Sequence, residues 1–88
     1  MIINIKNLKK KIIYRATYRG SKEMDKLLST FTKKYINSFS YTELTYLCDL
    51  LDFDDENLYK FNQQKKVLIE IEKNKVSELF KNFIYKDE

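Results

Sequence analysis

The fold is decided by the stretch Tyr18-Arg19-Gly20-Ser21-Lys22-Glu23-Met24-Asp25, which holds the only glycine in a chain of 88 residues. Gly20 adopts a positive φ without steric cost, so it predicts the end of one helix. Ser21 can cap the next helix through its hydroxyl, and Glu23 and Asp25 put negative charge where the dipole of that helix favours it. The stretch therefore predicts a corner between two helices.

Amphipathic helices are predicted on both sides of this corner. Upstream, over about residues 5–19, apolar residues follow helical spacing on one face: Ile5, Leu8, Ile12 and Ala16. Downstream, over about residues 22–37, the amphipathic pattern is the strongest in the chain: Met24, Leu27, Leu28, Phe31 and Tyr35. Glu23 and Asp25 border this second stripe from opposite edges, which argues against a catalytic pair of carboxylates.

Three further helices are predicted. A capping box at Ser40-Tyr41-Thr42-Glu43 starts a helix that runs to about Leu51, with this inward face: Leu44, Leu47, Cys48 and Leu51. A short helix is expected to start near Asp55. The last helix carries the stripe Val76, Leu79, Phe80 and Phe83. Between them, residues 62–73 alternate as in a strand but lack a partner strand, so we expect a linker that merges into helix.

Composition agrees with a purely helical fold. The chain has no proline and one glycine, so it lacks the turn chemistry of strands and hairpins. Its hydrophobic content of 43% is enough for one small core in 88 residues. We therefore predict an all-α protein, a small single-domain bundle of about five helices over residues 1–88.

The net charge of +4 is unevenly distributed. Residues 1–34 carry ten Lys or Arg against two acids, whereas residues 35–60 carry six acids against Lys60. This polarity suggests an oriented protein partner or simple solubility at least as readily as a polyanion. Arg15 and Arg19 lie one turn apart along the edge of the first apolar stripe, where they are placed to pair with carboxylates of a neighbouring helix or of another protein.

The sequence also sets expectations about compartment. A single cysteine cannot form an internal disulfide, which fits a reducing compartment. The N-terminal apolar run is too short for a signal peptide, and no run approaches the ~20 residues of a membrane span. We expect a soluble, cytoplasmic protein without a membrane partner.

Catalytic chemistry has few candidates in this chain. There is no histidine to act as a general base, no zinc ligand set and no glycine-rich loop for phosphates or a dinucleotide. Cys48 is expected to be a small core residue and not a reactive thiol. We expect a binding module and not an enzyme.

Two segments resemble the bacterial FAD assembly factors of the SdhE family. Arg19, Gly20, Glu23 and Asp25 match the R-G-x-x-E-x-D signature of that family position for position. Residues 50–61 are similar to its L-L-x-x-x-D-x-D-L-x-x-W segment at identical spacing, with Asn57 and Phe61 in place of the second acid and the tryptophan. The resemblance covers about residues 5–61.

The resemblance implies a five-helix protein that promotes covalent attachment of FAD to a histidine of a client, the flavoprotein subunit of succinate dehydrogenase and possibly of fumarate reductase. It implies that FAD belongs to the client and is not stably bound here. The expected client-binding residues are Arg15, Arg19, Gly20, Glu23 and Asp25, in a monomer that binds no nucleic acid.

Other functions are compatible with a small basic bundle of pI ≈ 9.1. One is nucleic-acid binding, although the lysines of the first helix scatter around its surface and no turn glycine marks a helix-turn-helix arrangement. The other is an antitoxin-like or scaffold role through the same surface, which no residue excludes.

Overall fold

A computed structural model describes residues 4–64 and 71–85. These residues form α1 (Ile5–Thr17), α2 (Lys22–Tyr35), α3 (Tyr41–Leu51), α4 (Asp55–Gln63) and α5 (Lys75–Lys81), with a 3₁₀ turn, η1 (Ile36–Ser38), after α2. The described part of the chain contains no strand. The prediction of a small all-α fold with about five helices is confirmed.

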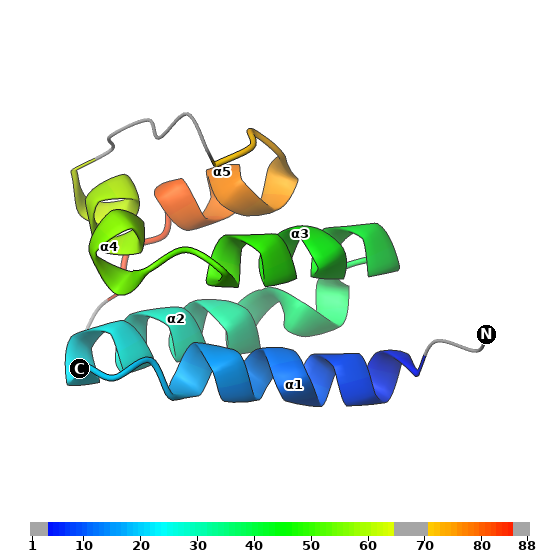
Figure 1. Ribbon diagram of the computed structural model, residues 1–88. Coiled ribbons are helices and arrows are strands. Elements are labelled where there is room, and N and C mark those ends of the chain that lie inside the picture. The colour runs from blue at the N-terminus through cyan, green and yellow to red at the C-terminus, as the bar shows by residue number, and fades with distance from the viewer. Residues whose placement is uncertain (1–3, 65–70, 86–88) are drawn as a thin grey trace.

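The helices are arranged around α3 (Figure 1). The antiparallel pair α1 and α2 lies on one side of α3, and α4 and α5 lie on the other. Because α3 packs against both α1 and α5, it needs apolar residues on two faces. Leu50, which was not assigned to the inward face, is therefore buried, while Cys48 is only half-buried at the edge of the core.

The first helix ends two residues earlier than its apolar pattern suggests. Tyr18 is its C-cap and donates its N–H to the carbonyl of Tyr14 at 3.1 Å. The amide of Arg19 leaves the helical direction and donates to Oδ1 of Asp25 at 2.5 Å. Ser21 accepts from the amide of Met24 at 3.3 Å, so its predicted capping role is confirmed.

The start of α3 also agrees with its prediction. The Ser40 amide donates to Oε1 of Glu43 at 2.8 Å, and the Glu43 amide donates to Oγ of Ser40 at 3.2 Å, which completes the capping box. The Ser40 amide, followed by the Lys75 ammonium, lowers the pKa of Glu43. Before this helix, α2 stops at Tyr35 and the chain continues as η1, so the predicted helical turn at 36–37 is 3₁₀ and not α.

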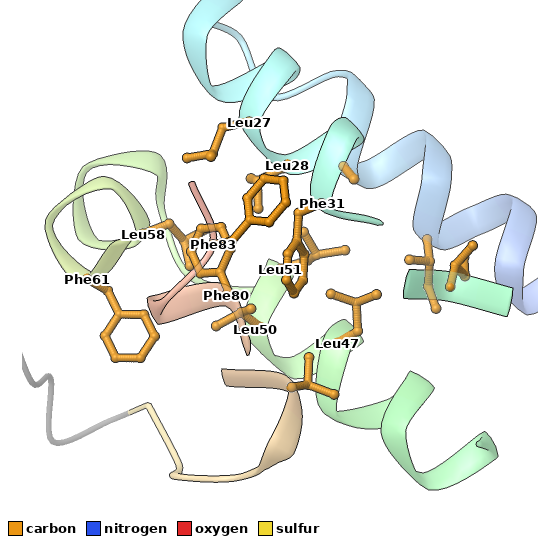
Figure 2. Packing of buried hydrophobic residues seen from close by; sticks show 14 of the residues in the cluster. Leu27, Leu28, Phe31, Leu47, Leu50, Leu51, Leu58, Phe61, Phe80 and Phe83 are labelled. Atoms are coloured by element: carbon orange, nitrogen blue, oxygen red, sulfur yellow. The ribbon is translucent and has the colours of Figure 1, made fainter. Parts of the chain in front are cut away.

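The core is built around Phe31 (Figure 2). Its ring meets Phe80 and Phe83 edge to face, with centroids 5.2 Å and 5.3 Å away. The predicted stripes supply most of the core, whose other buried apolar members are Ile12, Ala16, Met24, Leu27, Leu28, Ile36, Phe39, Leu44, Leu47, Leu50, Leu51, Leu58, Phe61, Ile71 and Val76. Ile5 is the exception: it is 44% exposed at the first residue of α1, so core contact begins one turn later at Leu8.

The buried side-chain amide of Asn62 connects α4 to the end of α5. Nδ2 of Asn62 donates to the carbonyls of Phe80 and Phe83 at 2.7 Å and 2.9 Å, and Oδ1 accepts from the side chain of Gln63. The Phe80 carbonyl also accepts from the amide of Phe83 at 3.1 Å, so Asn62 adds a second donor there and connects α4 to the chain just after α5. The sequence pattern did not indicate this role.

The segment of ambiguous pattern is only partly described. Asn62 and Gln63 still belong to α4, and residues 65–70, with the alternating Val67 and Ile69, lie outside the described residues. Ile71 is buried, and Asn74 caps α5 by accepting from the amide of Ser77 at 2.8 Å. Among the described residues that follow, from Ile71 onward, α5 begins at Lys75.

The helices are short. The longest of those described, α2, has 14 residues, whereas a membrane-spanning helix needs about 20. Within the described ranges, none combines the length and apolar character needed to cross a bilayer.

Candidate functional site

The α1–α2 corner, residues 18–25, meets the turn between α3 and α4 at one end of the bundle (Figure 1). The corner holds the sequence signature Arg19-Gly20-Ser21-Lys22-Glu23, and the turn holds the second matched segment. These two segments, more than 30 residues apart in the chain, are therefore in contact in the folded protein.

Arg19 makes the connection. Its Nε lies 2.9 Å from Oδ1 of Asp55, and its Nη1 and Nη2 donate to the carbonyls of Leu51 and Phe53 at 2.8 Å and 2.7 Å. The Arg19 side chain is only 12% exposed. One planar guanidinium thus satisfies carbonyls at the end of α3 and pairs with the first residue of α4. We call this set of contacts the Arg19 clamp.

Arg15, one turn upstream, makes a contact that is more exposed to solvent. Its Nη2 lies 2.5 Å from Oδ1 of Asp52, and its Nη1 is 3.5 Å from the carbonyl of Cys48. The two charged side chains are 38% and 69% exposed, so the pair is expected to contribute at most about 1 kcal/mol. The prediction that both arginines can pair with carboxylates of a neighbouring helix is confirmed. Nearby, burial raises the pKa of the half-buried Cys48 thiol.

The two acids of the corner face different surroundings. Asp25 accepts the Arg19 amide and fixes the course of the corner. The exposed side chain of Glu23 makes no hydrogen bond or ion pair with any other described residue. It lines a shallow groove of about 480 Å³ whose other lining residues are Lys22, Met24, Lys26, Leu27, Tyr59, Gln63 and Tyr85. The structure thus separates these carboxylates, as the helical spacing predicted.

Glycine is favoured at position 20 because of the backbone conformation there, and not because a side chain would clash with a neighbouring atom. The φ of Gly20 is +105°, in the region that L-residues rarely adopt. A Cβ added to it would meet no atom within 4 Å. The peptide at Gly20 is therefore open to a partner from outside.

The acids of the α3–α4 turn have roles that the sequence only partly indicated. The sequence predicts a helix start near Asp55, and Asp54 accepts from the Asn57 amide at 2.9 Å as the N-cap of α4. Asp52 and Asp55, however, pair with Arg15 and Arg19. The uneven distribution of charge along the sequence could have revealed these pairs, because arginines of the basic first third form ion pairs with aspartates of the acidic middle.

The corner is suited to recognition. It presents one carboxylate without a partner among the described residues and one open peptide, next to a nearly buried arginine that connects the corner to the α3–α4 turn. Across residues 4–64 and 71–85, no three His, Cys, Asp or Glu side chains converge as metal ligands would. Of the five residues predicted to bind a client, Arg19 and Asp25 are engaged within the chain, Arg15 is partly engaged, and Gly20 and Glu23 face outward. Their role toward a client stays a prediction.

Comparisons with known proteins point to one family. The model of the Sdh5 family, described as "Flavinator of succinate dehydrogenase", matches residues 10–84, a range that contains both the corner and the α3–α4 turn. Over 49 residues the chain is 45% identical to a mitochondrial succinate dehydrogenase assembly factor 2 of Scheffersomyces stipitis and 41% identical to that of Debaryomyces hansenii. These stretches cover 56% of this chain and 33% and 34% of the two relatives, so the chain spans about a third of their length. No solved structure matches.

Proposed function

This chain belongs to the Sdh5 family, the flavinators of succinate dehydrogenase, and we propose that it binds the flavoprotein subunit of that enzyme and promotes covalent attachment of FAD to a histidine of the subunit. The flavoprotein of fumarate reductase is a second client of the same class. In this proposal the chain acts as an assembly factor, and the reacting groups belong to the client.

The observation that carries the proposal is the Arg19 clamp. Its three donors fix the α1–α2 corner on the last residue of α3, on the following turn and on the first residue of α4, and Glu23 and the Gly20 peptide face outward. A surface that is fixed before binding loses little conformational entropy when a partner docks. This arrangement supports a docking corner better than it supports a catalytic site.

The proposal gives the five predicted residues different tasks. Glu23 meets a cationic group of the client, and Gly20 lets the client backbone approach closely. Arg19 and Asp25 are positioning residues that hold the corner, and Arg15 supports it through Asp52. Docking would hold the domains of the client so that its histidine faces the flavin, which is an effect of orientation. This chain has no histidine of its own.

Glu23→Gln tests the contact with the client. A charge-assisted contact in an interface is worth about 1.5–3 kcal/mol, so we expect at least about tenfold weaker binding to the flavoprotein. In a strain lacking the native protein, in-gel flavin fluorescence of the client subunit should fall. Glu56→Gln is the matched control because Glu56 is the second residue of α4, as Glu23 is of α2. Normal flavinylation with Glu23→Gln would refute the role of this carboxylate.

Two substitutions of Gly20 allow a second test, because both carry the same free-energy cost of a strained backbone. Gly20→Ala and Gly20→Arg both force a side chain onto φ +105°, and each should lower the free energy of unfolding by about 1 kcal/mol. Only Gly20→Arg adds bulk to the open face, so only it should abolish flavinylation. Urea titration measures the stability and flavin fluorescence the activity. Equal losses of flavinylation in the two variants would show that backbone strain, and not access for the client, is responsible.

A further inference from the structure

The outer face of α1 carries side chains that neither the core nor the Arg19 clamp uses. Around this helix, Ile12 and Ala16 are buried, Lys9 donates to Oδ1 of Asn37 in η1 at 3.3 Å, and Arg15 reaches α3. At ~100° per residue, the side opposite the core bears five exposed residues, which we call the tyrosine face: Asn7, Lys10, Lys11, Tyr14 and Tyr18.

The two tyrosines are unusual in their exposure. Tyr14 is 66% exposed and Tyr18 is 68% exposed, and their ring centroids are 4.8 Å apart. Single exposed aromatic residues are common on protein surfaces, but adjacent ones form a patch. Tyrosine contributes a large contact area with little rotational freedom to lose, which is why it is enriched among the residues that dominate binding interfaces.

We propose that the tyrosine face is a second contact with the flavoprotein client and that it docks on an acidic client surface with apolar atoms for the two rings. This inference rests on the proposed function. The face is continuous with the α1–α2 corner because Tyr18 is also the first residue of that corner. Its only charged residues are Lys10 and Lys11, so an acidic partner surface would complement it.

The charges around this face favour a protein over a nucleic acid. Arg15 and Arg19 are matched by Asp52 and Asp55, so they add little positive potential near the tyrosines. Lys9 lies on another side of the helix, against Asn37. Two lysines do not make the continuous basic track that a phosphate backbone requires.

The test measures binding of the full chain to the purified flavoprotein subunit. The double variant Tyr14→Ala/Tyr18→Ala should weaken binding at least about tenfold, whereas Tyr41→Ala should change it less than about twofold. Tyr41 is the matched control because it is an exposed tyrosine at the first residue of α3. Helical circular dichroism of both variants should match that of the wild type.

A charge variant tests the same face with the rings in place. Lys10→Glu/Lys11→Glu should slow association with the client and flatten its dependence on salt, because long-range attraction to an acidic surface is lost. It also keeps the inference testable if removal of both tyrosines disturbs α1.

The outcomes separate this inference from the proposed function. If the wild-type chain neither binds the flavoprotein nor supports its flavinylation, the proposed function fails and this inference fails with it. If the wild type binds while the tyrosine and lysine variants bind equally well, only the inference is overturned. The inference would also be overturned if the tyrosine variants bound the flavoprotein normally but lost binding to duplex DNA or RNA.

Discussion

Replacing Arg19 by alanine is expected to lower the free energy of unfolding by about 3 kcal/mol, because it removes three hydrogen bonds in which the donor is charged. The carbonyls of Leu51 and Phe53 and the carboxylate of Asp55, which is 28% exposed, would then lose their partner. Domains of this size are stable by only about 5–10 kcal/mol. Urea unfolding followed by circular dichroism measures the change.

Arg15→Ala is the control for this experiment, because the Arg15–Asp52 pair is exposed and should contribute at most about 1 kcal/mol. Arg19→Lys should recover only part of the loss, since an ammonium does not reproduce the planar fork. A different outcome would support direct contact of Arg19 with the client: flavinylation lost in Arg19→Ala while the free energy of unfolding stays at the wild-type value.

Asn62→Asp is expected to be the most destabilising conservative change, at about 3–5 kcal/mol near neutral pH. It replaces the amide that donates to Phe80 and Phe83 with a carboxylate that faces those carbonyls in a site only 1% exposed. Burial would raise the pKa of the new carboxyl above its unfolded value, and protonation would then favour the folded state. The deficit should therefore shrink as the pH falls. Urea titrations at pH 7 and at about pH 4.5 measure both effects.

Asn57→Asp is the control within the same helix. Asn57 lies in the first turn of α4, where the dipole favours an acid, and the resemblance places an acid there in the family. This substitution should change the free energy of unfolding by less than about 0.5 kcal/mol. Equal losses in both variants would mean that the contacts of Asn62 with the end of α5 do not matter for stability.

Features that depend on neighbours in sequence were predicted well. Gly20 as a helix stop, Ser21 as a cap and the Ser40–Glu43 box each depend on residues within one turn, and the structure confirms them. The apolar stripes also located most of the core, because each helix buries one face. The end of α1 was wrong by two residues, since the amide of Arg19 bonds to Asp25 instead of continuing the helix.

Features that depend on distant contacts were missed. No periodic pattern connects Arg19 with Asp55, or Asn62 with the end of α5, because those contacts join residues 36 and 18–21 positions apart. Leu50 was missed and Cys48 misplaced because a single stripe was assigned to a helix that is packed on two sides.

The family was predicted from the Arg19-Gly20 signature together with the Leu50–Phe61 segment, and the match over residues 10–84 confirms it. The expected cytoplasmic location stays a prediction, and the two relatives named above are mitochondrial by name. The predicted set of client-binding residues also stays a prediction. The structure indicates which of these residues should be tested first. Glu23 comes first, because changing it disturbs no described contact.

The Arg19 clamp also has a consequence for when the docking corner exists. It closes a loop of 36 residues between Arg19 and Asp55, so it forms only after the α3–α4 turn has met the first two helices. Closing a loop of this length costs conformational entropy that the contacts of the clamp must offset. The amide of Arg19, held by Asp25, should exchange its hydrogen with solvent more slowly when the clamp is intact than in Arg19→Ala. Under the proposed function, an incompletely folded copy would lack this corner, so only fully folded molecules would bind the client.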